Sequence, residues 1–191
     1  MKVILFPIFL FVSFCNHVVT GNEVSDAFAK SQIQPDIIDI PPSVLLSVKY
    51  PENELEVQLA NELQVSEVKS QPIVKWETEP NALYTLVKVD PDALSRENPI
   101  YRSWLHWLVV NVPGNQLTNG KVIASYKGAG PPPKTGLHRY VFLVFKQSDR
   151  IEDYDVKDGD RKKFNLRQFI NKNELESKPI AGAFYQAKNS D

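Results

Sequence analysis

The chain has 191 residues, of which 42% are hydrophobic and 24% charged, and its formal net charge at pH 7 is −1. No long run of one charge sign is present, which argues against nucleic acid as a partner. The length suffices for one domain with a sizeable core and is too short for two ordinary domains.

The first 21 residues are typical of a secretory signal peptide. One Lys precedes an apolar run from Val3 to Phe14, and small or apolar residues at 19 and 21 have the spacing of a cleavage site. The run is shorter than the roughly 20 apolar residues that span a bilayer, so we expect no transmembrane segment. Residues 22–191 are predicted to form one secreted, extracellular domain. Cleavage removes Cys15, the only cysteine, so a packed core rather than a disulfide must stabilise this domain.

The first predicted elements are short. Residues 23–33 have the pattern of an amphipathic helix that ends before Pro35. Residues 45–50, 54–63 and 73–79 are runs separated by Pro, Asn or Gln, as expected for strands of an antiparallel sheet.

Three stronger strand candidates follow, at residues 82–90, 103–112 and 138–147. They are rich in aromatic and β-branched residues, so we expect them to be central and buried on both faces. A helix over 164–173 and a strand over 180–187 complete the pattern. This order favours a mainly β fold, a β-sandwich built on a large sheet.

Polar residues lie at or near the ends of the three strong strands. Asp90 and Asp92 follow the first, His106 lies in the second, and His138 and Tyr140 begin the third. Ligand pockets form at such strand ends on β scaffolds. Each residue alone also fits a structural role, because Asp beside Pro caps turns and a single buried His is commonly a core residue.

Strict alternation predicts the faces on which these side chains lie. It places Trp104, His106, Leu108 and Val110 on one face of their strand, and Leu105, Trp107 and Val109 on the other. In the later strand, His138 shares a face with Tyr140, Phe142 and Val144.

The segment "GAGPPP", residues 128–133, has five Gly or Pro in six positions. Such a loop holds its backbone in one shape. It can therefore wall a pocket or present N–H groups to an anion, or it can be a tight structural crossover.

Four motifs together carry a family resemblance. "DPDALSR", "YRSWLHWLVVNVPG", "YKGAGPPPKTGLHRYVFLVF" and "IAGAFYQA" occur in order over roughly residues 33–187. They resemble the phosphatidylethanolamine-binding protein family, also known for Raf kinase inhibitor protein, and look most like its secreted insect members. The resemblance implies a large central antiparallel sheet, a smaller sheet on one side, peripheral helices on the other, and a small cavity for anions such as phosphate or a phosphorylethanolamine head group.

Carried over by motif position, the resemblance also implies the residues that line this cavity. They are Asp90, Asp92, Trp104, His106, Gly130, Pro131, Pro132, His138 and Tyr140. A carboxylate repels phosphate, so we expect Asp90 to orient a histidine or to accept from a ligand ammonium.

Two departures from the family pattern stand out. Leu94 replaces a proline whose preceding bond tends to be cis, and we expect a trans bond and a shifted turn near Asp92. The chain also stops at Asp191, where relatives continue into a C-terminal helix beside the cavity, so this helix is expected to be absent.

The favoured function is that of a secreted, monomeric binding protein for a phospholipid head group or a similar phosphate-bearing ligand. The alternative is a serine protease inhibitor or another extracellular regulatory protein of the same fold. An enzyme is not expected, because no nucleophile paired with a base is evident. No cofactor is implied, and a zinc site is disfavoured by the wide spacing of the His and Asp residues. If histidine protonation assists anion capture, affinity rises as the pH falls through roughly 6.5.

Overall fold

The computed structural model describes residues 19–154, 156 and 159–189. The signal peptide predicted over residues 1–21 therefore lies outside the described residues except for its last three. Within the described part of the chain, no helix combines the length and the hydrophobicity needed to cross a membrane.

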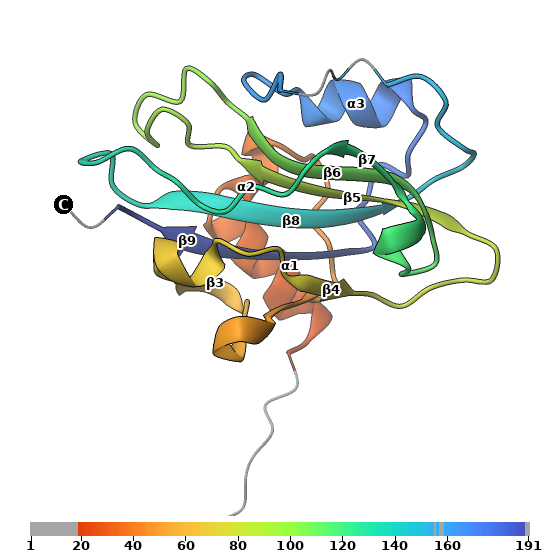
Figure 1. Ribbon diagram of the computed structural model, residues 1–191, viewed down its shortest axis with the longest axis horizontal. Helices are drawn as coiled ribbons and strands as arrows, with labels where there is room; N and C mark the ends of the chain where they lie inside the picture. Colours follow the sequence, from red (N-terminus) through yellow and green to blue (C-terminus); the bar gives the residue numbers. More distant parts are fainter. Residues whose placement is uncertain (1–18, 155, 157–158, 190–191) are drawn as a thin grey trace, which may run out of the picture.

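Two sheets form the body of the molecule (Figure 1). The six strands of the large sheet are, in spatial order, β3 (Leu59–Glu62), β9 (Ala181–Ala187), β8 (His138–Lys146), β5 (Leu83–Asp90), β6 (Trp104–Pro113) and β7 (Lys121–Ala124). The small sheet has the order β2 (Leu55–Glu56), β1 (Ser47–Tyr50), β4 (Ile73–Lys75). All pairs are antiparallel except β3 with β9. The predicted mainly β sandwich is confirmed.

Helices and loops form the segments outside the two sheets. The helices are α1 (Gly21–Lys30), α2 (Ile33–Asp36) and α3 (Leu166–Lys172), with short 3-10 turns η1 (Pro51–Asn53), η2 (Val65–Val68) and η3 (Leu117–Asn119). Thr20 caps α1 because its hydroxyl accepts from the Glu23 N–H while the Glu23 carboxylate accepts from the Thr20 N–H. The Asn165 side chain caps α3 by accepting from the Gln168 N–H.

The large sheet separates two hydrophobic layers. On one face, Val87, Val141 and Leu143 pack with Phe28 of α1 and Phe169 of α3. On the other face, toward the small sheet, lies a second cluster that includes Val48, Tyr50, Tyr84, Leu86, Trp107, Tyr140, Phe142 and Tyr185. β5 and β8 are buried along nearly their whole length, as expected for central strands covered on both faces.

One predicted strand divides into two. Residues 54–63 form β2 in the small sheet and β3 in the large sheet rather than a single strand. The Asn61 side chain accepts from the Gln58 N–H and donates to the Glu56 carbonyl, and Ala60 has a φ of 65°. This local turn interrupts the extended backbone, and the chain changes sheets there.

A β-bulge in β6 makes the predicted alternation wrong at His106. Val89 pairs with Leu105 and Lys88 with Trp107, so His106 is the extra residue. Its ring packs edge-on against Tyr140, 5.1 Å between centroids, on the small-sheet side. The expected partners Leu108 and Val110 belong to the helix-side cluster instead. In β8, by contrast, Tyr140, Phe142 and Val144 share one face as expected.

Replacing Gly182 by Ala is expected to lower the free energy of unfolding by about 1–3 kcal/mol. A Cβ atom there would lie 2.7 Å from Pro42 Cγ, 2.8 Å from Phe28 Cζ and 3.0 Å from Leu143 Cδ2. Denaturant unfolding measures the change. Gly130→Ala is the matched control, because a Cβ at Gly130 meets nothing within 4 Å. Equal stability of the two variants would contradict the close packing at Gly182.

Candidate ligand-binding site

A cavity of about 530 Å³ opens where β5 ends and where β6 and β8 begin. These strand ends lie on the left in Figure 1. The lining residues are Lys69, Asp90, Ala93, Leu94, Tyr101, Trp104, His106, Lys127, Gly128, Ala129, Gly130, Pro132, His138 and Lys162. Histidines that are 32 positions apart in the sequence thus meet at one cavity, with the Gly/Pro segment as part of its wall.

Six of the nine residues expected at this site line the cavity, namely Asp90, Trp104, His106, Gly130, Pro132 and His138. Asp92, Pro131 and Tyr140 are not part of the lining. Tyr140 is buried behind the wall, and its hydroxyl accepts from the Gly130 N–H at 3.3 Å. Burial raises the pKa of this phenol, which therefore stays protonated. Tyr140 supports the wall rather than facing a ligand.

A hydrogen-bonded chain joins Asp90 to the Gly/Pro loop. Asp90 Oδ2 lies 2.8 Å from His138 Nδ1, and His138 Nε2 lies 2.9 Å from Thr135 Oγ1. The Thr135 hydroxyl donates its proton to the Pro132 carbonyl at 2.7 Å. The other Asp90 oxygen accepts from the Asp92 N–H at 2.7 Å. Asp90 thus orients a histidine. This series of hydrogen bonds connects the Gly/Pro loop to the end of β5.

The direction of these hydrogen bonds decides what His138 can do. Since the only hydroxyl proton of Thr135 goes to Pro132, Thr135 Oγ1 accepts from His138 Nε2. Both ring nitrogens of His138 are occupied, so this ring has no free donor for an anion. The Thr135 hydroxyl is likewise not prepared as a nucleophile, because His138 does not accept its proton. Burial raises the pKa of Asp90 against the opposing effect of the His138 hydrogen bond.

His106 faces the cavity with a defined tautomer. Its Nδ1 lies 3.0 Å from the Lys127 carbonyl oxygen, which can only accept, so Nδ1 carries the proton. Burial, followed by the charge of Lys88, holds the pKa of His106 well below its ordinary value. The lowered pKa favours the neutral ring near pH 6.5, which argues against a gain in anion affinity through protonation of His106.

Asp92 has a structural position instead of one in the cavity. It is completely buried and accepts from the Arg139 Nε, Nη2 and backbone N–H groups. The expectation of a trans bond before Leu94 is wrong, because the Ala93–Leu94 bond is cis. The turn is held by contacts from outside it, including the Tyr101 N–H donating to the Ala93 carbonyl at 2.8 Å. Local sequence preference does not encode such contacts. Leu94 itself lines the cavity.

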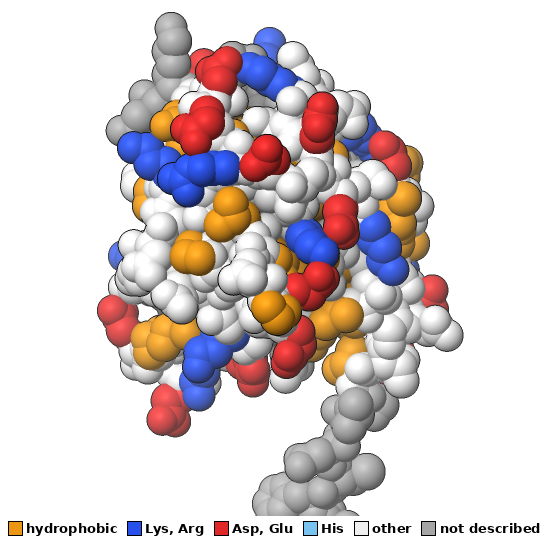
Figure 2. All heavy atoms as spheres, turned by 90° about the vertical axis from the view of Figure 1, so that its right-hand side faces the viewer, with side chains coloured by type: hydrophobic (Ala, Val, Ile, Leu, Met, Phe, Trp, Pro, Cys, Tyr) orange, Lys and Arg blue, Asp and Glu red, His pale blue; other side chains and the backbone are white. Residues whose placement is uncertain are grey.

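Three lysines at the cavity were missed by the sequence reasoning. Lys69, Lys127 and Lys162 line it, and Asp90 is the only carboxylate among its described lining residues. Lys127 Nζ and Lys162 Nζ lie 5.6 Å and 5.9 Å from the Trp104 ring centroid. No local signal marks these lysines, because they come from three segments that only the fold brings together. On the opposite end of the molecule, shown in Figure 2, acidic and basic side chains alternate without a patch of one sign.

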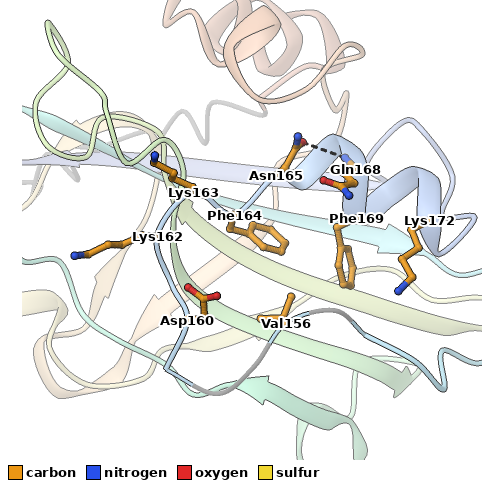
Figure 3. A pocket seen from close by; sticks show the side chains of 9 residues that line it. All are labelled: Val156, Asp160, Lys162, Lys163, Phe164, Asn165, Gln168, Phe169 and Lys172. Atoms are coloured by element: carbon orange, nitrogen blue, oxygen red, sulfur yellow. Dashed lines mark hydrogen bonds between the residues drawn. The ribbon is translucent and has the colours of Figure 1, made fainter.

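A second cavity of about 210 Å³ lies beside α3 (Figure 3). Phe164, Phe169 and exposed lysines line it, and its lining contains no histidine. Lys162 borders both cavities, and in Figure 3 its ammonium points away from Phe164 and α3. The larger cavity is the better candidate, because buried and oriented polar groups stand in its wall.

Fold and site together define a β-sandwich with a partly apolar, lysine-rimmed cavity at one end of its large sheet. The family model described as "Phosphatidylethanolamine-binding protein" matches residues 48–186. The chain belongs to the phosphatidylethanolamine-binding protein family.

Two relatives and one solved structure illustrate the similarity. "Putative odorant-binding protein A5" of Drosophila melanogaster is 41% identical over 82% of this chain and 76% of that protein. The "26 kDa secreted antigen" of Toxocara canis is 38% identical over 84% of this chain, and the matched region spans 63% of the antigen's length. The crystal structure of carboxypeptidase Y inhibitor with its cognate proteinase has a TM-score of 0.76 over 88% of this chain and 96% of that chain, with 24% identity. At this identity the likeness concerns the fold alone.

Proposed function

We propose that this protein is a secreted binding protein that holds the phosphate of a phospholipid head group, or of a similar small ligand, in the His106 cavity. The observation that carries the proposal is the charge balance of the lining. Lys69, Lys127 and Lys162 are cationic, while Asp90 is engaged with His138. Ammonium groups are effective phosphate partners, and a partly enclosed site strengthens the attraction.

The apolar part of the cavity supports a ligand larger than phosphate. Tyr101, Trp104, Leu94 and Ala129 line it, and its volume of about 530 Å³ exceeds what a bare anion occupies. This differs from the small polar cavity expected from the sequence. An organic group attached to the phosphate can lie against the aromatic wall while the lysines bind the anion.

Secretion is supported by the signal-peptide pattern and by a secreted relative in Toxocara canis. Serine protease inhibition, the alternative expected from the sequence, has support only at the level of fold, through the carboxypeptidase Y inhibitor. The binding proposal rests on the cavity itself and is therefore preferred.

Replacing Lys127 and Lys162 together by Met is expected to weaken binding of phosphorylethanolamine at least tenfold. Loss of one hydrogen bond to a charged group changes the binding free energy by about 1.5–3 kcal/mol, and 1.4 kcal/mol corresponds to a factor of ten. Isothermal titration calorimetry at low salt measures the dissociation constant, and added salt should weaken binding.

The matched control is Lys49→Met, which removes an exposed lysine of β1 in the small sheet, away from the cavity lining. Its affinity should equal that of the wild type. No detectable heat with the wild type, or equal affinities for the double variant and the control, would refute the proposed function.

A further inference from the structure

Lys88 is a fully buried lysine in the middle of β5. Its Nζ lies inside a set of aromatic rings, with centroid distances of 4.5 Å to Tyr126, 5.2 Å to Phe142, and 5.4 Å to both Tyr140 and Tyr185. Lysine is almost never fully buried unless it is paired. Among the described residues, no carboxylate forms an ion pair with Lys88. A central strand position would ordinarily hold an apolar residue, so this lysine requires an explanation.

The hydrogen bonds of Lys88 run toward the candidate site. Nζ donates to the Lys127 carbonyl at 3.2 Å, and the same oxygen accepts from His106 Nδ1 at 3.0 Å. The Lys127 N–H in turn donates to the His106 carbonyl at 2.8 Å. One peptide group therefore connects the buried amine to the imidazole that faces the cavity.

The second acceptor of Lys88 fixes the direction of its donors. The Tyr126 hydroxyl donates to the Val68 carbonyl at 2.8 Å, so its oxygen must accept from Lys88 Nζ at 3.2 Å and from the Tyr50 hydroxyl at 2.9 Å. Lys88 is thus a donor in both of its hydrogen bonds. From the buried side of the cavity wall, it holds the Lys127 carbonyl in place through a hydrogen bond.

We infer that Lys88 is a positioning residue that keeps His106 a neutral imidazole, with its proton on Nδ1 and its Nε2 lone pair available to a ligand. The inference deepens the proposed function, on which it rests. The lysines of the rim supply the donors for a phosphate, and His106 supplies an acceptor. The preferred ligand is then a phosphate ester whose organic part carries an N–H or O–H group.

The charged and titratable groups around His106 agree with this assignment. Lys88 faces His106 from β5, and Tyr140 faces it from β8. Lys127 lies in the segment after β7. Arg161 lies in the segment before α3 and donates to the His106 carbonyl at 3.3 Å. Asp90, the carboxylate in the same wall, is bonded to His138. Burial is the largest cause that lowers the pKa of His106, and the charges of Lys88, Arg161 and Lys127 lower it further, with no free carboxylate in the wall to oppose them.

Nitrogen-15 NMR of the histidine side chains tests the inference without ligand. In the wild type, His106 should show a protonated Nδ1 and a bare Nε2 throughout pH 5.5–7.5. In Lys88→Met, which keeps a similar side-chain volume and removes the largest charge contribution, the pKa of His106 should rise toward its ordinary value. Lys88→Leu is a second apolar replacement that should give the same result.

Lys127→Met is the matched control, because it removes a cation near His106 and leaves the Lys127 carbonyl in place. His106 should keep its wild-type tautomer and stay neutral in this variant, because burial and the charge of Lys88 lower its pKa more than the charge of Lys127 does. The inference is overturned by a wild-type His106 that titrates near pH 6.5 or carries its proton on Nε2. An unchanged His106 titration in both Lys88 variants would overturn it equally.

Binding of inorganic phosphate provides a second readout. The ratio of the Lys88→Met affinity to the wild-type affinity should rise about tenfold between pH 7.5 and pH 5.5, because a protonated His106 adds a charge-assisted hydrogen bond. A constant ratio contradicts the inference. If neither protein binds phosphate or phosphorylethanolamine, the proposed function fails, while the NMR result still decides whether Lys88 controls His106.

Discussion

Replacing Arg139 by Met is expected to lower the free energy of unfolding by about 3–5 kcal/mol. The Arg139 side chain is 1% exposed and binds Asp92 in a bidentate manner, through Nε at 2.9 Å and Nη2 at 2.6 Å. It also donates to the Ser31 carbonyl at 2.6 Å and to Asp36 at 2.7 Å. Without the guanidinium, the Asp92 carboxylate stays buried with its charge uncompensated, which is the expensive outcome of breaking a buried ion pair.

The effect should be large because Arg139 joins three parts of the fold. It lies on β8, Asp92 follows β5, and residues 31–36 run from the end of α1 through α2. Arg102 contacts Asp36 at 3.0 Å, yet it reaches Asp92 only at 3.8 Å. Arg102 therefore replaces little of what Arg139 provides.

Chemical denaturation of Arg139→Met against the wild type measures this loss. Arg150→Met is the control, since Arg150 forms an exposed ion pair with Glu152 and its removal should change stability by less than about 0.5 kcal/mol. The double variant Asp92→Asn with Arg139→Met should be more stable than Arg139→Met alone, because it also removes the buried charge. A loss below about 1 kcal/mol for Arg139→Met would show that Asp92 finds other partners.

Much of the fold could be predicted from the sequence because burial leaves a direct pattern. β5 and β8 are buried along nearly their whole length, and their aromatic and β-branched residues predicted central strands. The division of residues 54–63 between two sheets could not be predicted from a burial pattern. It depends on the hydrogen bonds of the Asn61 side chain and on the sheet edges at which β2 and β3 pair. The bulge at His106 was equally hidden, because an extra residue leaves the composition of β6 unchanged.

The candidate site was predicted where its residues lie in contiguous motifs. Asp90, Trp104, His106 and His138 belong to such segments, and the structure places all four at one cavity. What the sequence could not provide is the direction of each hydrogen bond. Whether a histidine can receive a ligand depends on its hydrogen-bond partners, such as Thr135 and the Lys127 carbonyl. The protons in these hydrogen bonds are assigned only once the distances are known. The three rim lysines depend in the same way on the assembled fold.

Replacing Lys88 by Met is expected to raise the free energy of unfolding at pH 7 by about 2 kcal/mol, because burying an amine that is protonated in the unfolded chain costs folding free energy. The aromatic rings and two hydrogen bonds offset part of this cost. Methionine fills a similar volume and makes favourable contacts with aromatic rings. For a domain of this size, the change corresponds to an increase of roughly 4–8 °C in Tm.

The pH dependence of this difference identifies its cause. Burial places the pKa of Lys88 in the folded state well below its ordinary value of 10.5. As the pH falls from 10.5 toward the folded-state pKa, the unfolded chain binds a proton that the folded chain does not, so the wild type loses stability relative to Lys88→Met. Below the folded-state pKa the difference is constant, and above pH 10.5 it is smallest.

Denaturant unfolding of both proteins at pH 7 and at pH 10.5 tests this linkage, with Lys49→Met, an exposed lysine variant, as the control without a pH-dependent difference. A stability gain that is the same at both pH values would mean that packing, rather than desolvation of the amine, causes it. A gain that shrinks at high pH would show that the wild type retains a lysine that destabilises its own core. Such a residue is expected where a buried amine acts on a neighbouring site, here through the Lys127 carbonyl on His106.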